Sequence, residues 1–438
     1  MQYLPNLFFA LALIAGMGFF LMNIRKVSRN IKLGKDVNRT DQKSERLKNM
    51  LMIALGQSKM IKRPLSGFLH IIVYVGFIII NIEVLEIIID GLFGTHRIFQ
   101  DLLGNGLYGF LIGTFEVLAA LVFVAVVIFW LRRNVSNIKR FLSKEMKGWP
   151  KNDGNNILYF EMVLMSLFLI MNATDTIFQQ AGIGNVISQF ITPLFDGFSP
   201  EVLHTIERSA WWFHILGILV FLNYLFYSKH LHILLAFPNT YFANLNPKGQ
   251  FTNLESVTTE VKLMMDPDAD PYAATAEGAE DAVPEKFGAS DVADLDWVQL
   301  LNAYTCTECG RCTSVCPANL TGKELSPRKI MMDTRDRLEE VGRNIDSNEG
   351  TFVDDGKQLL NDYISPEELW ACTSWNACVE ECPVNIDPLS IIMDMRRYLV
   401  MEESAAPQEL NMMMTNIENN GAPWQYNQQD RLNWADEE

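Results

Sequence analysis

The sequence predicts an all-α protein of two unlike halves, a bundle of five transmembrane helices followed by a small, mainly helical domain built around cysteines. Three observations carry this prediction. Five apolar runs, each long enough to cross a bilayer, lie before residue 240. Residues 1–250 hold 23 Lys and Arg against 15 Asp and Glu, and the rest of the chain holds 13 against 37, so a basic half precedes an acidic one. All seven cysteines lie between Cys306 and Cys382.

The first apolar run covers residues 4–24 and is predicted to be a membrane helix rather than a cleaved signal peptide. No basic segment precedes it, no small-residue cleavage site follows it, and its positive charges come after it. Four more runs of membrane-spanning length follow, at residues 66–91, 107–131, 157–178 and 210–235.

Lys and Arg set the predicted orientation of these helices. They crowd residues 25–63 and 132–151 and are nearly absent from the other two loops. By the positive-inside rule, the N-terminus lies outside the cell and the first and third loops lie in the cytoplasm. Five crossings then place the cysteine domain in the cytoplasm. The chain is thus expected to be a multi-pass protein of the cytoplasmic (inner) membrane, in contact with lipid.

Composition divides the chain into four predicted parts. Residues 1–240 form the bundle, residues 241–296 an acidic linker, residues 297–402 the cysteine domain, and residues 403–438 a polar tail. The tail is expected either to act as a docking arm or to be disordered. Helix starts within the cysteine domain are predicted from capping patterns at Ser326-Pro327, at Ser365-Pro366-Glu367-Glu368 and at Asp387-Pro388.

The first cysteine run has the spacing Cys-x2-Cys-x2-Cys-x3-Cys-Pro, which wraps an iron–sulfur cubane and lends its fourth cysteine to a second cluster. Zinc is disfavoured because seven thiols do not divide into tetrahedral sets, and disulfides are disfavoured in the reducing cytoplasm. The spacing therefore predicts a dicluster ferredoxin domain. Its first centre, cluster one, is a 4Fe–4S cluster held by Cys306, Cys309, Cys312 and, from the second run, Cys382.

The second cysteine run keeps the same frame, but Trp375 stands where its second cysteine belongs. Cluster two is left with Cys316, Cys372 and Cys378. Three thiolates suit a 3Fe–4S cluster, because the corner that faces Trp375 has no soft ligand. The alternative is a second 4Fe–4S cluster with water or another oxygen ligand at that corner.

The predicted bundle contains no cysteine, so a redox cofactor there would need histidine ligands. A histidine inside a membrane helix is costly and is by default a functional candidate. His70 on the second helix and His232 at the end of the fifth both lie near the cytoplasmic face, which predicts axial ligation of one haem b. His214, 18 residues before His232 and on the same helical face, is the candidate for a second haem, and His230 is expected to point to nearly the opposite side of the helix. Alternatively, His230 and His232 snorkel at the interface beside Lys229.

Acidic and amide side chains in the bundle are a second kind of candidate. Glu83 and Asn81 on the second helix are candidates for quinone or proton chemistry, since polar residues inside a membrane bundle often serve such roles. Glu86, Asp90 and Asp175 share this interpretation, although a position at a helix end explains Asp90 and Asp175 equally well.

The membrane half resembles the five-helix cytochrome b subunits of nitrate reductase and of membrane heterodisulfide reductase, and the cysteine domain resembles the dicluster ferredoxin subunit of heterodisulfide reductase. The fused order, with Tyr304-Thr-Cys-Thr-Glu-Cys-Gly-Arg-Cys312 and Leu369-Trp-Ala-Cys372, is similar to bacterial membrane-bound electron-transfer-flavoprotein:menaquinone oxidoreductases. Those relatives continue past a segment like residues 416–424 into a Cys-Cys-Gly domain. The resemblance therefore implies a separate iron–sulfur subunit that carries this domain.

The sequence departs from the family pattern at two places. The ferredoxin subunits carry four cysteines in the second run, whereas the frame around Trp375 resembles the three-iron site of succinate dehydrogenase and fumarate reductase iron–sulfur subunits. The nitrate reductase gamma subunit has two histidines on its second helix, and only His70 matches here. A second haem thus lacks one of the ligands that the family uses.

These features predict an electron-transfer subunit of a quinone-linked oxidoreductase in a respiratory chain. Electrons would pass between menaquinone and a soluble donor, expected to be an electron transfer flavoprotein acting through the Cys-Cys-Gly subunit. Two alternatives remain open: a haem-free membrane anchor or redox sensor, and a subunit of a heterodisulfide, lactate or glycolate:quinone oxidoreductase. No nucleic-acid partner is expected.

Overall fold

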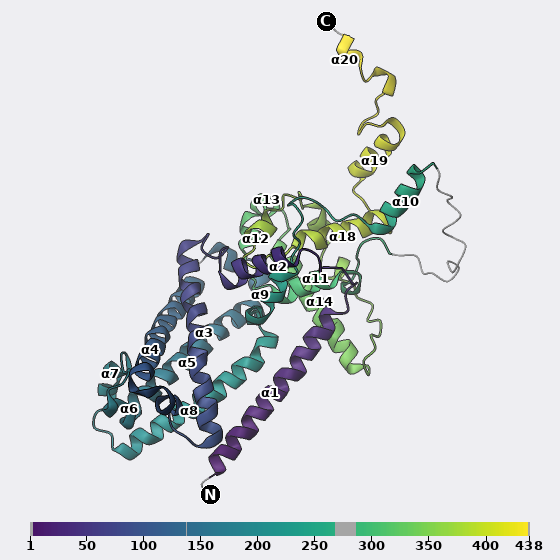
Figure 1. Cartoon of the computed structure of the whole chain (residues 1–438). Coiled ribbons are helices and arrows are strands. Elements are labelled where there is room, and N and C mark those ends of the chain that lie inside the picture. Colours follow the sequence, from purple (N-terminus) through teal and green to yellow (C-terminus); the bar gives the residue numbers. More distant parts are fainter. Residues whose placement is uncertain (1–2, 137, 268–285, 437–438) are drawn as a thin grey trace.

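The computed structural model describes residues 3–136, 138–267 and 286–436, and within these residues it is helical, with no β-structure beyond two isolated bridges. Long helices lie side by side in one body, and shorter helices form a second body at one end of the first (Figure 1). The arrangement confirms the predicted all-α class.

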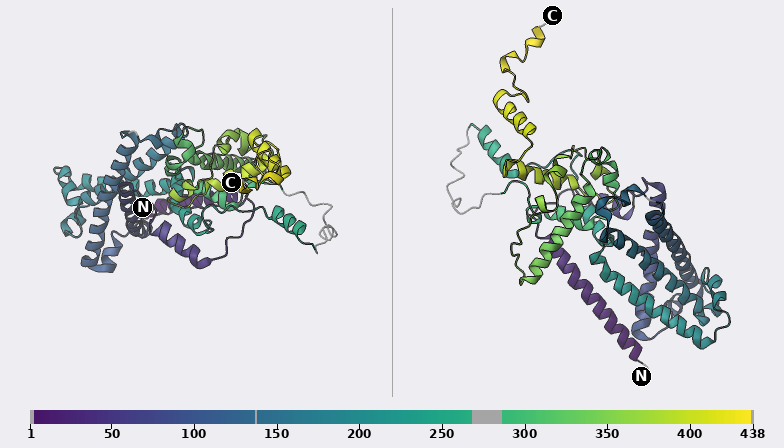
Figure 2. Two further views of the ribbon diagram at one scale, coloured as in Figure 1. Left: turned by 90° about the horizontal axis from the view of Figure 1, so that it is seen from above. Right: turned by 180° about the vertical axis from the view of Figure 1, so that it is seen from behind.

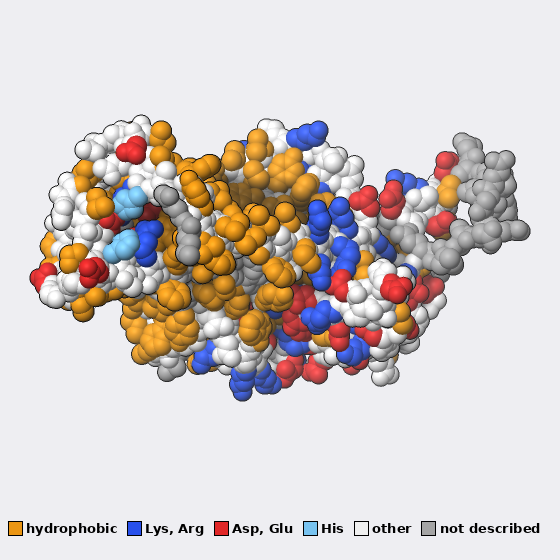
Figure 3. Space-filling model, turned by 90° about the horizontal axis from the view of Figure 1, so that it is seen from below, with side chains coloured by type: hydrophobic (Ala, Val, Ile, Leu, Met, Phe, Trp, Pro, Cys, Tyr) orange, Lys and Arg blue, Asp and Glu red, His pale blue; other side chains and the backbone are white. Residues whose placement is uncertain are grey.

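Five helices are long and apolar enough to cross a membrane, as the sequence predicts. Helix α3 packs on α4, α4 on α5 and α5 on α8, while α1 lies along α3 and α8. Hydrophobic side chains gather on the surface of this bundle, and charged side chains gather on the other half (Figure 3). The five helices are α1 (Leu4–Ile31), α3 (Pro64–Phe93), α4 (Ile98–Asn134), α5 (Trp149–Thr174) and α8 (Pro200–Tyr224).

Two of these helices have bounds that differ from the apolar runs. Helix α4 begins nine residues before the run at residue 107, and its first turns join the rest at a kink, where Gly104 has φ 72°. Helix α5 ends at Thr174 because Asp175 is extended and its carboxylate accepts the N–H of Phe178, which starts the short helix α6 (Thr176–Ala181). An acid at the helix end thus caps a new helix, as the end-of-helix interpretation of Asp175 expects.

The prediction of one continuous helix over residues 210–235 is wrong. Helix α8 ends at Tyr224, a 3-10 turn covers Leu225–Tyr227, and Ser228 is extended with ψ 146°. The Ser228 hydroxyl accepts the N–H of His230 and starts a second 3-10 turn, Lys229–Leu231, before α9 (His232–Tyr241). His214 and His232 therefore lie on different helices, and their spacing no longer places them on one face.

Short elements cover both ends of the bundle. At the end that meets the second body lie α2 (Lys43–Met50), the π-turn Leu51–Leu55, and the 3-10 turns Lys139–Phe141 and Lys144–Met146. At the far end lie α6, α7 (Ser188–Ile191) and the 3-10 turn Thr192–Phe195.

The second body is the cysteine domain, and its core is a single cluster of aliphatic side chains and cysteines that also includes Val27 of α1 and Leu235 of α9. The predicted caps are confirmed: Ser326 accepts the N–H of Lys329, and Ser365 and Glu368 form a capping box. The helices are α11 (Trp297–Thr305), α12 (Arg311–Val315), α13 (Pro317–Leu320), α14 (Pro327–Ser347), α15 (Leu359–Asp362), α16 (Pro366–Trp370), α17 (Ala377–Glu381) and α18 (Pro388–Met401), after a 3-10 turn at Val292–Asp294.

The predicted linker and tail contain helices that bury no residue. Helix α10 (Glu255–Met265) lies in the predicted linker, of which residues 268–285 fall outside the described part of the chain. Helix α19 (Gln408–Asn420), a 3-10 turn at Gln428–Asp430 and α20 (Asn433–Asp436) extend away from the two bodies (Figure 2).

Candidate iron–sulfur and haem sites

The two cysteine runs fold into loops with the same backbone pattern. In the first loop, Glu308 has φ 53° and Gly310 has φ 70°, on either side of Cys309. In the second loop, Ser374 has φ 56° and Asn376 has φ 63°, on either side of Trp375. Because left-handed residues are uncommon outside glycine, the repeat of this pattern means that Trp375 occupies the backbone position of the second ligand.

Gly310 is required in the first loop for a second reason. A Cβ atom at this position would lie 2.5 Å from a guanidinium nitrogen of Arg328, which is fully buried. That guanidinium also donates to the carbonyl oxygen of Arg140 and pairs with Glu145 at 2.6 Å, both in the loop between α4 and α5. Arg328 therefore lies against the first cysteine loop and also joins α14 to the loop between α4 and α5.

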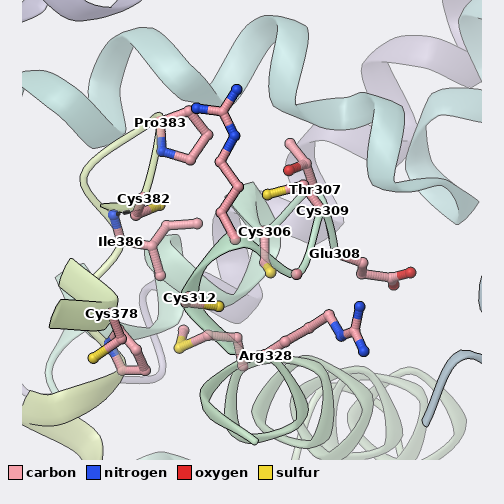
Figure 4. Close-up of a pocket in the computed structure, with 14 residues that line it drawn as sticks. Cys306, Thr307, Glu308, Cys309, Cys312, Arg328, Cys378, Cys382, Pro383 and Ile386 are labelled. Atoms are coloured by element: carbon pink, nitrogen blue, oxygen red, sulfur yellow. Dashed lines mark hydrogen bonds between the residues drawn. The ribbon is translucent and has the colours of Figure 1, made fainter. Parts of the chain in front are cut away.

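The structure brings the predicted ligands of cluster one to a single cavity. The cavity is lined by Cys306, Cys309 and Cys312 from the first run and by Cys382 from the second, and Cys378 reaches its edge (Figure 4). The N–H of Ile386 donates to the sulfur of Cys382 at 3.3 Å, the kind of contact that tunes a cluster. The backbone therefore allows Cys382 of the second run to reach the cavity formed by the cysteines of the first run.

The remaining thiols belong to a second group. Cys316, Cys372 and Cys378 lie near enough to one another that charge on one raises the pKa of another. The N–H of Ser374 donates to the sulfur of Cys372 at 3.4 Å. The side chain of Trp375 is 73% exposed, so it covers little of this group.

Burial raises the pKa of Cys306 and Cys378 to about 12 and that of Cys382 to about 11, and neighbouring thiols add to the effect. All seven cysteines are free rather than disulfide-bonded. Since a metal ligand must be a thiolate, cluster assembly at these sites releases protons.

A group of three histidines lies at the end of the bundle that meets the cysteine domain. The rings of His230 and His232 stand 5.4 Å apart at 82°. Burial lowers the pKa of His230 well below its usual range, and charge on His232 or His70 lowers it further. The expectation that His230 points away from His232 is wrong, because the extended backbone at Ser228 interrupts the helix and changes the direction of the chain before the two histidines.

Two observations on the histidine rings fit a haem between different segments. Nδ1 of His232 is held by the carbonyl oxygen of Lys229 at 3.0 Å, which fixes the ring as axial histidines usually are fixed. Nδ1 of His70 is buried without a hydrogen-bond partner among the described residues. Lys229, which precedes these two histidines, is buried, and its ammonium contacts Glu308 rather than water.

His214 lies apart from this group. It is 2% exposed, its Nδ1 contacts the carbonyl oxygen of Leu164 at 3.0 Å, and Phe168 lies beside its ring. The other two histidines pair with acids at the far end of the bundle, His96 with Asp175 and His204 with Glu207 of its own helix α8. In the described chain the structure thus brings no second histidine against His214.

Buried carboxylates gather near the far end of the bundle, and all but one are hydrogen-bonded. Glu86 accepts from the N–H of Phe99 and the hydroxyl of Tyr108, and Glu116 accepts from Asn172 and from two backbone N–H groups. Glu83 is 3% exposed, and its Oε2 has no partner among the described residues. Asn81, in contrast, is exposed and donates to its own helix.

The fold and the cysteine geometry define the class: a membrane protein with a dicluster iron–sulfur domain for electron transfer. Residues 299–383 match the family described as 4Fe-4S dicluster domain. No solved structure matches the chain.

Two curated proteins are similar over nearly the whole chain. The probable iron-sulfur-binding oxidoreductase FadF of Bacillus subtilis is 29% identical over 437 residues, covering 93% of this chain and 57% of the relative. The EtfAB:quinone oxidoreductase of Syntrophomonas wolfei is 25% identical over 434 residues, covering 92% and 55%. The chain therefore spans little more than half the length of these relatives. Over 109 residues, a quarter of the chain, it is 31% identical to a CoB-CoM heterodisulfide reductase subunit of Methanosarcina acetivorans, covering 53% of that protein.

These similarities support an iron–sulfur oxidoreductase component, and the prediction of electron-transfer chemistry is confirmed at that level. Sequence reasoning missed the contacts that join the two bodies. Two of these contacts are the ion pairs Arg328–Glu145 and Lys229–Glu308. The partners of each pair lie far apart in the chain, so the sequence shows their charges but not their pairing.

Proposed function

We propose that the protein is a membrane-bound iron–sulfur and haem b subunit that passes electrons between a soluble redox partner and menaquinone. The observation that carries the proposal is the contact between the two bodies. The loop that holds cluster one lies directly against the segment that holds His230 and His232. Two of the three proposed ligands of cluster two belong to the second run, and Trp375 in that run is exposed to solvent. This order supports electron entry at cluster two and transfer through cluster one into the bundle.

Cluster two is proposed to be a 3Fe–4S cluster held by Cys316, Cys372 and Cys378, with a 4Fe–4S cluster carrying an oxygen ligand as the alternative. The support is chemical, because the backbone position of the missing ligand is filled by an indole that has no metal donor and points away. Cluster one is proposed to be a 4Fe–4S cluster on four thiolates.

His70 and His232 are proposed to hold one haem b, which supplies a one-electron carrier inside the bundle. The chain's own contribution is to fix the His232 ring through the Lys229 carbonyl oxygen and to bury the His70 ring. His214 is retained as a candidate for a second haem. Glu83 is proposed to exchange protons with the quinone, because its carboxylate is the buried one with a free oxygen among the described residues.

The donor is proposed to be an electron transfer flavoprotein acting through a separate Cys-Cys-Gly iron–sulfur subunit. The name of the Syntrophomonas relative supports the flavoprotein and the quinone. The density of Lys and Arg in residues 25–63 supports a cytoplasmic position for the cysteine domain.

Low-temperature EPR of the purified protein beside a pyridine haemochrome assay tests this proposal. A three-iron signal in the oxidised state, a cubane signal after dithionite and b-type haem are expected. Iron–sulfur signals without haem would favour the haem-free anchor or sensor. The similarity to a heterodisulfide reductase component keeps a heterodisulfide:quinone complex as the second candidate, and the proteins that co-purify with the chain distinguish it from a flavoprotein complex.

A further inference from the structure

Lys229 is a buried lysine that touches both bodies of the molecule. It lies in the second 3-10 turn after α8, Lys229–Leu231, and is 9% exposed. Its ammonium pairs with the carboxylate of Glu308 and donates to the carbonyl oxygen of Pro150 at 2.7 Å. Glu308 is 3% exposed and lies in the first cysteine loop, between Cys306 and Cys309. A buried ion pair therefore joins the loop of cluster one to the histidine segment.

The backbone of Lys229 makes the second half of this connection. Its carbonyl oxygen contacts Nδ1 of His232 at 3.0 Å. Its N–H donates to the carboxylate of Asp153 on α5 at 3.1 Å, and Asp153 also accepts the hydroxyl of Tyr224 at 2.7 Å. One residue is thus fixed to the cluster loop by its side chain and to a predicted haem ligand by its main chain.

Each ion of the Lys229–Glu308 pair has a second partner of opposite charge. Glu308 has a second cation, Arg335, at 2.8 Å, and Lys229 has a second carboxylate, Asp153, at 3.7 Å. Burial lowers the pKa of Lys229, while the charges of Glu308 and Asp153 oppose that effect. Buried ion pairs add little stability compared with apolar residues of the same size, so a pair at this place calls for another role.

We propose that Lys229 is a positioning residue for electron transfer between cluster one and the site at His70 and His232. Its charge, with that of Glu308, sets the reduction potential of cluster one, and its carbonyl oxygen orients His232. With a cluster on the first cysteine loop and an acceptor held by the two histidines, the reaction would be the transfer of one electron between them, with no bond formed or broken. The part that concerns His232 rests on the function proposed above.

The sign of the electrostatic effect follows from the charge of the cluster. Reduction adds a negative charge to cluster one, so a nearby ammonium favours the reduced form and a nearby carboxylate favours the oxidised form. The low-dielectric surroundings of Lys229 and Glu308 strengthen both effects. Removing one charge leaves the other with its second partner, Arg335 or Asp153, so neither variant strands a bare buried ion.

An EPR redox titration of cluster one in the purified full-length protein tests the proposal. Lys229→Met is expected to lower the ratio of reduced to oxidised cluster at a fixed potential about tenfold, which is about 59 mV for a one-electron couple. Glu308→Gln is expected to change the ratio in the opposite direction. Lys144→Met, whose side chain is 88% exposed, is the matched control and is expected to leave the titration unchanged.

Opposite shifts in the two variants support the proposal, because a purely structural role would loosen the loop in both and move them the same way. Equal potentials in all forms, or shifts of the same sign, would overturn it. If Lys229→Met does not assemble, Glu308→Gln alone decides, since an unchanged or lowered potential contradicts the proposal. The cluster-one signal is read without haem or quinone, so a protein that lacks haem refutes the proposed function and leaves this test intact.

Discussion

Replacing Trp375 with cysteine is expected to convert cluster two from a three-iron to a four-iron centre. The loop around Trp375 already has the left-handed residues that flank Cys309 in the first loop, with φ 56° and 63° against φ 53° and 70°. A thiolate at this position therefore needs no new backbone conformation, and it supplies the fourth soft ligand that the corner lacks.

The cost of Trp375→Cys to folding is small. A tryptophan side chain that is 73% exposed buries roughly 60 Å² of its surface, which corresponds to about 1.5 kcal/mol of hydrophobic stabilisation. A domain stability of about 5–15 kcal/mol tolerates that loss. The variant is thus expected to assemble, and its spectrum reports on the cluster rather than on misfolding.

EPR of the oxidised and dithionite-reduced protein is the assay for this change. The oxidised three-iron signal should disappear in Trp375→Cys, and a second reduced cubane signal should replace it. Trp375→Ser removes the indole without adding a thiolate and should keep the three-iron signal. An undiminished three-iron signal in Trp375→Cys would refute the reasoning, and so would two cubane signals in the unaltered protein.

Three further predictions test other parts of the structure. His70→Ala and His232→Ala should each abolish haem in the pyridine haemochrome assay while the cluster signals persist, whereas retained haem in either variant would exclude that histidine as a ligand. Glu83→Gln should slow quinone reduction about 100-fold, the lower end of the contribution expected from a group that transfers protons. Asp101→Asn, which changes an exposed acid at the same end of the bundle, should leave the rate unchanged, and equal rates in Glu83→Gln and the unaltered protein would exclude Glu83. Burial alone would raise the pKa of the Asp175 carboxyl, but the hydrogen bond with His96 and the charge of Arg97 lower it below its value in the unfolded chain. The ionised carboxylate therefore stabilises the fold fully above about pH 4, and this stabilisation is lost as the pH falls through the pKa of the folded state. Thermal unfolding in detergent should therefore depend less on pH below about pH 4 in Asp175→Asn than in the unaltered protein, and identical pH profiles would contradict this pairing.

The features that could be predicted from the sequence depend on neighbours in the chain. Uninterrupted apolar runs predict the five candidate membrane helices, and the spacing of the cysteines around Cys309 predicts the loop that lines the cysteine cavity. Capping residues such as Ser365 signal their helices because the hydrogen bonds are local.

The features that escaped prediction depend on contacts between distant segments. Residues 210–227 are mostly apolar and lead into the polar stretch Ser228-Lys229-His230, but a polar stretch near a membrane boundary does not by itself predict a break in the helix. In the structure the chain is extended at Ser228, and the N–H of Lys229 donates to the buried carboxylate of Asp153. Lys229 and Glu308 are 79 residues apart, and a lysine at a membrane boundary ordinarily predicts exposure to water. The same break moved His230 beside His232, which periodicity alone placed on opposite sides.

The most direct test of the electron path is a rapid-mixing experiment on the full-length protein in liposomes. Clusters reduced with dithionite are mixed with a menaquinone analogue, and the iron–sulfur and haem absorbance are followed together with quinol formation. The account predicts that clusters and haem are reoxidised together and that one quinol forms for each pair of electrons lost. Clusters that stay reduced in the presence of quinone, with cofactors intact, would contradict the central claim that this chain connects an iron–sulfur domain to the quinone pool.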